Sequence, residues 1–84
     1  MKIYYITFRS VTFAQRAEKV LAAREIRCSL QRTPRWMEAQ GCGYALRIWT
    51  KEPEVSVQIL KKHSIPMRRL YVQNVGGELE EMPV

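Results

Sequence analysis

The spacing of apolar and polar residues along the chain predicts four β-strands. The first is rich in β-branched and aromatic side chains, as expected for a central strand. The second alternates strictly, so that Cys28 faces inward and Arg27 faces outward. The predicted strands are residues 2–8 (KIYYITF), 26–31 (IRCSLQ), 44–49 (YALRIW) and 67–73 (MRRLYVQ).

Two segments between these strands carry helical spacing. The first begins at Ser10 or Thr12, and Thr12 with Gln15 fits a capping box. Its apolar stripe consists of Phe13, Ala14, Ala17, Val20 and Leu21. The second covers residues 52–63, with Val55, Ile59 and Leu60 as its predicted apolar face.

The predicted order, β-α-β-β-α-β, indicates an α+β ferredoxin-like sandwich. We expect a four-stranded antiparallel sheet with both helices on one face and the other face open. Residues 1–75 would form this single domain. Residues 76–84, which contain three of the eight glutamates, would form a flexible acidic C-terminal tail.

The residue inventory excludes several kinds of chemistry. The chain of 84 residues has eight acidic residues, all glutamate, one histidine and two cysteines. A Ser-His-Asp triad and a Cys/His zinc site are therefore not expected, and we predict neither a metal nor another cofactor. A carrier or binding protein fits this inventory better than an enzyme does.

The charge and hydropathy of the chain bear on its partners and location. The formal net charge of +6 suits an anionic partner such as nucleic acid, a phosphate-bearing ligand or an acidic protein. No apolar run approaches the roughly 20 residues needed to cross a bilayer. The N-terminus resembles a strand more than a signal peptide, so we expect a cytoplasmic protein without membrane contact.

The two cysteines lie in different settings. Cys28 is predicted to be a small core residue. Cys42 stands between Gly41 and Gly43 in the connection that also holds Arg32 and Arg35, where guanidinium groups favour the thiolate.

An antiparallel pairing of the second and third strands gives an expectation for the distance between the thiols. Cys28 would lie opposite residue 45 and Cys42 opposite residue 31. The two cysteines would then be about 10 Å apart along the ladder, at about 3.3 Å per residue. This separation is too large for a disulfide.

Several motifs together resemble a known family. Thr-Pro-Arg at 33–35, Cys-Gly at 42–43 and Ala-Leu-Arg at 45–47 are similar to the selenium/sulfur carrier-like family, and so are ITFRS and AQRAEKVL near the N-terminus. The likeness covers roughly residues 3–50. Two features depart from the family pattern, Arg32 and the pair Gln40-Gly41 before the cysteine.

The resemblance implies a carrier role centred on Cys42. The thiol would accept sulfur or selenium as a persulfide or selenosulfide from a donor protein such as a cysteine desulfurase. Arg35 would stabilise the thiolate or steer an anionic donor. The candidate binding residues around the thiol are Arg32, Thr33, Pro34, Gly41 and Gly43.

An alternative from a different class is a non-enzymatic binding module that uses the open sheet face. Aromatic and arginine side chains would alternate there, as on sheets that stack RNA bases. Of these two uses, a homodimer that covers apolar surface is favoured over RNA binding. A ligand-binding regulatory role rests on fold analogy alone. The predicted open-face residues are Tyr5, Arg47, Trp49, Arg69 and Tyr71.

Overall fold

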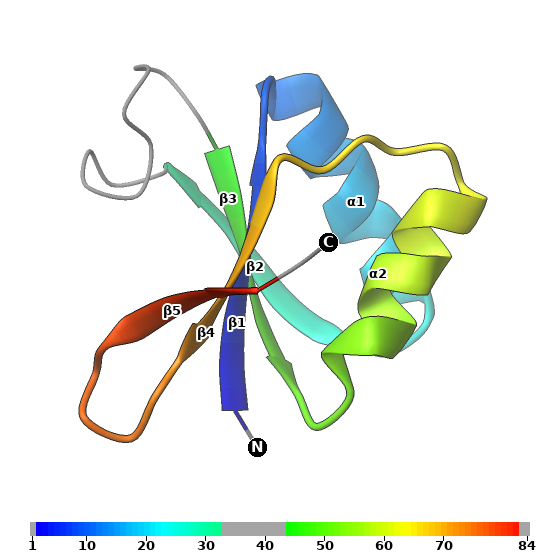
Figure 1. Ribbon diagram of the computed structural model, residues 1–84. Helices are drawn as coiled ribbons and strands as arrows, with labels where there is room; N and C mark the ends of the chain where they lie inside the picture. Colours follow the sequence, from blue (N-terminus) through cyan, green and yellow to red (C-terminus); the bar gives the residue numbers. More distant parts are fainter. Residues whose placement is uncertain (1, 33–43, 83–84) are drawn as a thin grey trace.

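The computed structural model describes residues 2–32 and 44–82. These residues form one antiparallel sheet, in the order β2-β3-β1-β4-β5, and two helices. Both helices lie on the same face of the sheet (Figure 1). The elements are β1 (Lys2–Phe8), α1 (Val11–Ala23), β2 (Arg27–Arg32), β3 (Tyr44–Thr50), α2 (Pro53–Lys62), β4 (Arg69–Gln73) and β5 (Leu79–Met82).

The α+β class, the two helices and the antiparallel sheet confirm the prediction, but the expected four strands are wrong. The fifth strand, β5, lies within residues 76–84, which we expected to form a tail, and it pairs with β4. Leu79 packs beside Tyr5 and Tyr71, whereas Met82 packs against the main core. Because these two apolar residues lie on opposite faces and flank two glutamates, the segment lacks the alternation of apolar and polar residues that predicts a strand.

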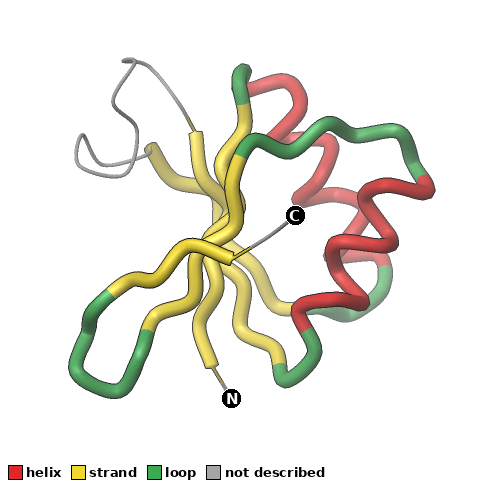
Figure 2. The backbone as a smooth tube through the Cα atoms, viewed as in Figure 1, coloured by secondary structure: helices red, strands yellow, loops and turns green. Residues whose placement is uncertain are grey.

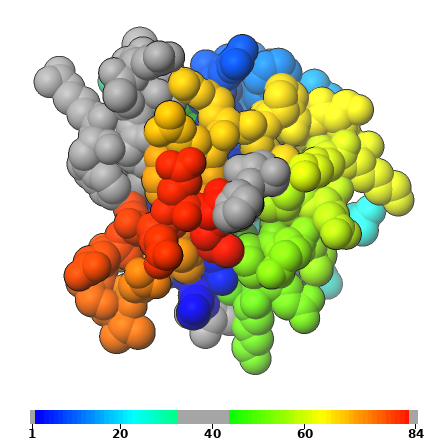
Figure 3. All heavy atoms as spheres, viewed as in Figure 1, coloured from blue at the N-terminus to red at the C-terminus, as the bar shows by residue number. Residues whose placement is uncertain are grey.

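The turn between β4 and β5 brings this strand back alongside β4. The Gly77 amide donates to the Asn74 carbonyl at 2.9 Å, and the Asn74 amide donates to the Glu78 carbonyl at 2.8 Å. Gly77 has a φ of 86°, which glycine adopts at little cost. A tight loop that ends in a left-handed glycine is a standard hairpin connection. The hairpin forms one edge of the molecule (Figures 2 and 3).

The main core lies between the helices and the sheet. Helix α1 begins after Ser10, whose hydroxyl accepts from the Phe13 amide at 3.4 Å. Its buried stripe confirms the predicted face, although Phe13 and Val20 are only partly buried. The fully buried core side chains include Ile6, Phe8, Ala14, Ala17, Leu21, Leu46 and Leu60.

The predicted face of helix α2 is right for Leu60, which is buried, and for Ile59, which packs partly buried against the core, but it is wrong for Val55. Ser56, Val57 and Leu60 point inward, whereas Val55 is 44% exposed. The helix starts with Pro53 at its first turn, and Val57 belongs to the main core. No helix in residues 2–32 and 44–82 is long and apolar enough to cross a membrane.

Candidate functional site

The predicted thiol site falls mainly outside the described residues. Thr33, Pro34, Arg35, Gly41, Cys42 and Gly43 all belong to residues 33–43. Arg32, the last residue of β2, is described: it is exposed and pairs with Tyr44, the first residue of β3. The connection that contains Cys42 therefore leaves and re-enters the sheet at neighbouring positions.

The end of the sheet at which this connection begins is rich in positive charge. Tyr44 also pairs with Phe8, so the end of β1 lies beside it, and Arg9 follows as an exposed residue. Arg68 donates its amide to the Thr7 carbonyl at 2.8 Å, which places the start of β4 at the same end.

Helix α1 adds to this electropositive end. The helix has no acidic residue in its first turn, and it begins three residues after Phe8. The N-terminus of a helix carries a partial positive charge. An anion or a thiolate would therefore be stabilised at this end of the sheet.

Cys28 lies in a setting that disfavours its thiolate. It packs against the main core from β2, and its Sγ donates to the Glu18 carbonyl at 3.8 Å. Burial raises the pKa of the Cys28 thiol, and the Glu18 carboxylate raises this pKa further. The Cys28 thiol is free.

The register of β2 corrects one expectation about Cys28. It pairs with Ile48, not with residue 45, and residue 45 pairs with Gln31. Strands β2 and β3 remain paired up to Arg32 and Tyr44, the two residues that flank residues 33–43. This pairing places Cys28 opposite Ile48. Cys42 itself precedes β3 and lies outside the described residues.

The five residues predicted on the open face share the face of the sheet opposite the helices. Tyr5 pairs with Arg47 on one side and with Tyr71 on the other, and Trp49 and Arg69 lie two residues along their strands. The tyrosines are nevertheless buried, with exposed fractions of 9% for Tyr5 and 8% for Tyr71. They form a second small cluster with Ile3 and Leu79, so their rings are not exposed for a base to stack on.

Apart from the tyrosines, three side chains on this face form a stacked array. The Cζ atoms of Arg27 and Arg47 each lie 4.9 Å from the centre of the Trp49 ring. Arg47 also lies 5.9 Å from the centre of the Tyr5 ring. Its Nε atom is buried and has no hydrogen-bond partner among residues 2–32 and 44–82, which costs about 1–3 kcal/mol. Arg27 was missing from the predicted set, although the alternation of β2 already placed it outward.

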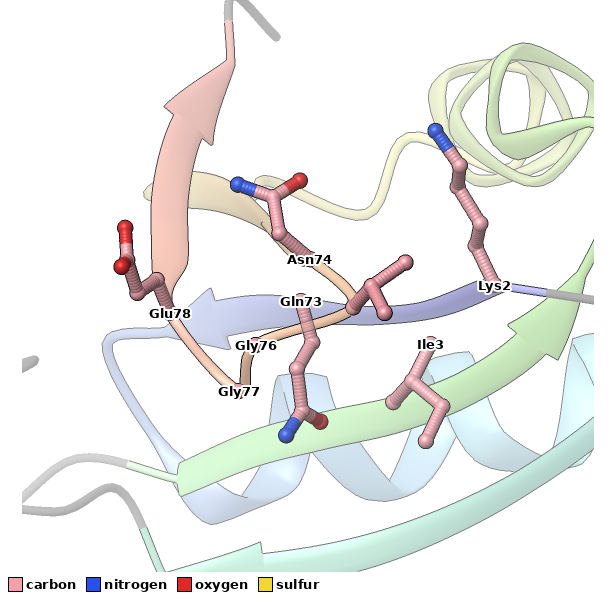
Figure 4. A pocket seen from close by; sticks show the side chains of 8 residues that line it. Lys2, Ile3, Gln73, Asn74, Gly76, Gly77 and Glu78 are labelled. Carbon is pink, nitrogen blue, oxygen red and sulfur yellow. The ribbon is translucent and has the colours of Figure 1, made fainter.

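A hollow of about 630 Å³ lies beside the β4–β5 hairpin (Figure 4). Ile3 and Gln73 point to one side of it, and Lys2 and Asn74 point to the other. Its side chains offer amides, an ammonium group and the Glu78 carboxylate, but no thiol. In residues 2–32 and 44–82, no three His, Cys, Asp or Glu side chains are grouped to hold a metal.

These features define a class: a small α+β domain with an electropositive sheet end and a cysteine-containing connection beside it. Residues 3–72 match the family described as "Putative Se/S carrier protein-like". The chain belongs to this family. The match includes the segment with Cys42 and all elements up to β4. No curated protein is significantly similar to the chain.

Proposed function

We propose that this protein carries sulfur or selenium on Cys42. The observation that supports this most strongly is the family match, which spans Cys42 and most of the domain. The setting of Cys28 supports it further, because burial and Glu18 hold that thiol in its protonated form. Of the two cysteines, Cys42 is thus the better candidate for an acceptor.

The positive charge at the sheet end supplies what the chemistry needs. Thiol exchange requires a thiolate nucleophile, and nearby cations raise the thiolate fraction. Arg9 and Arg32 are exposed at the end where residues 33–43 depart. Arg35 follows three residues after Arg32 in the chain. We assign to it the stabilisation of the Cys42 thiolate.

The transfer step is a thiol–disulfide type of exchange. The Cys42 thiolate attacks the outer sulfur of a donor protein's persulfide. The S–S bond of the donor breaks, the donor departs as a thiolate, and Cys42 becomes a persulfide. Atoms and electrons balance without an added oxidant, because the transferred sulfur keeps its oxidation state. Selenium would follow the same course from a donor selenosulfide.

Intact mass spectrometry tests the carrier role. The chain is incubated with a cysteine desulfurase and cysteine, and its mass is measured without reductant. We expect the wild type and Cys28→Ser to gain one sulfur atom and Cys42→Ser to gain none. A sulfur gain in Cys42→Ser, or none in the wild type, would contradict the proposal.

We also infer that the fold is a ferredoxin-like sandwich extended by an edge strand. The first six elements follow the order β-α-β-β-α-β, and both helices cover one face of the sheet. Strand β5 then adds to β4 at the edge. A deletion of residues 76–84 that leaves a cooperatively folded chain would support this division.

A further inference from the structure

We propose that the Arg27–Trp49–Arg47 array binds single-stranded nucleic acid. These three residues come from β2 and β3 on the face opposite the helices. Neither guanidinium group has a carboxylate partner in the part of the chain that is described. Two stacked, unneutralised arginines beside a tryptophan are suited to phosphates and to bases, which stack on aromatic rings and on guanidinium planes.

The exposure of the array allows such contacts. Arg27 is exposed and Trp49 is half-buried, so a base can stack on the guanidinium plane that lies over the indole. Arg27 and Trp49 also line a hollow of about 440 Å³ that contains Lys51. The hollow adds Lys51 as a third cation, and Glu25 and Glu52 also line it, so the excess positive charge lies mainly at the two stacked arginines. A strand of nucleic acid would therefore place a base on the array and its phosphates beside the arginines and Lys51.

A second copy of the chain fits this face less well. Tyr5 and Tyr71 are already buried within the chain, so a dimer would cover little apolar surface there. In the described residues, the exposed large apolar side chains are Val55 and Val75, which lie on α2 and in the hairpin loop. A two-fold axis through the array would also bring the arginines of the two copies close together. Charge complementarity thus favours a polyanion.

Binding is measured by fluorescence anisotropy with labelled single-stranded oligonucleotides of RNA and of DNA, over a series of salt concentrations. With three cations engaged, the slope of log Kd against log salt should be about 2, at about 0.7 per phosphate contact. Arg27→Gln should lower this slope by about 0.7. Arg16→Gln, which removes an exposed charge on α1, is the matched control and should leave the slope unchanged. The RNA and DNA arms show which sugar is preferred.

A second readout reports stacking directly. In a Trp36→Phe background, Trp49 is the sole tryptophan, and its fluorescence should be quenched as the oligonucleotide binds. Trp49→Leu should weaken binding about fivefold or more, because stacking contributes at least that factor per base. Circular dichroism checks that each variant folds.

Three outcomes would overturn the proposal. One is the absence of binding at low salt. Another is an equal loss in Arg27→Gln and Arg16→Gln, which would indicate diffuse attraction by net charge. The third is sedimentation as a dimer that Trp49→Leu converts to a monomer, which would assign the face to a second copy.

Discussion

The proposed chemistry predicts that the two cysteines react with an alkylating reagent at different rates. Two variants isolate the thiols: Cys28→Ser leaves Cys42, and Cys42→Ser leaves Cys28. We expect Cys42 to react faster at neutral pH. The reason is that burial and Glu18 raise the pKa of Cys28, whereas arginine neighbours would lower that of Cys42.

The size of the difference follows from ionisation. An ordinary thiol with a pKa of about 8.5 is about 3% thiolate at pH 7, and Cys28 has less. Lowering the pKa of Cys42 by about one unit would give about 24% thiolate. The lower basicity reduces intrinsic nucleophilicity about threefold, which leaves a net advantage of about threefold over an ordinary thiol. The partial burial of Cys28 increases this ratio.

The assay follows the loss of free thiol in each variant with iodoacetamide, from pH 6 to pH 10. The rate for Cys42 should level off at a lower pH than the rate for Cys28. Replacing Arg35 with Gln should move the Cys42 profile to higher pH. Equal rates for the two thiols at pH 7, or a faster Cys28, would refute the reasoning.

Three further predictions concern stability and are measured by urea unfolding. Gly77→Ala should lower the free energy of unfolding by about 1–2 kcal/mol, because φ is 86°, whereas Gly76→Ala, with open space around it, should change it little. Ser10→Ala should cost about 1 kcal/mol by removing the cap of α1, and Thr12→Ala should cost less; the reverse order would assign the cap to Thr12. The raised pKa of Cys28 stabilises the folded state below the unfolded pKa of about 8.5, so this contribution should be lost as pH rises through the folded value; Cys28→Ala should not show the loss.

The sequence predicts the central elements because their patterns are local. The first predicted strand, residues 2–8, coincides with β1 as observed, and the buried residues of α1 recur at helical spacing. In α2 the prediction was right for Leu60 and wrong for Val55, because Val55 and Val57 fit an apolar stripe about equally well. Packing in the main core, rather than composition, selects Val57.

The features that the sequence missed depend on contacts between distant segments. Strand β5 forms because Leu79 and Met82 find partners on opposite faces of the sheet, which no local pattern reveals. The burial of Tyr5 and Tyr71 likewise requires β5 beside β4. Alternation in β2 did place Arg27 outward, but only the pairing with β3 brings it over Trp49. The residues around Cys42 remain sequence predictions.

The array and the strand ends that flank residues 33–43 lie at opposite ends of the sheet. Along β1, the row of Trp49 contains Ile3, and the row of Arg32 and Tyr44 contains Phe8. These rows are five residues apart, or about 16 Å at about 3.3 Å per residue. Because they share no side chain, Cys42→Ser should leave nucleic-acid binding intact, and Arg27→Gln should leave sulfur loading intact. Loss of both activities in either variant would mean that one site serves both, and the separation along β1 argues against that.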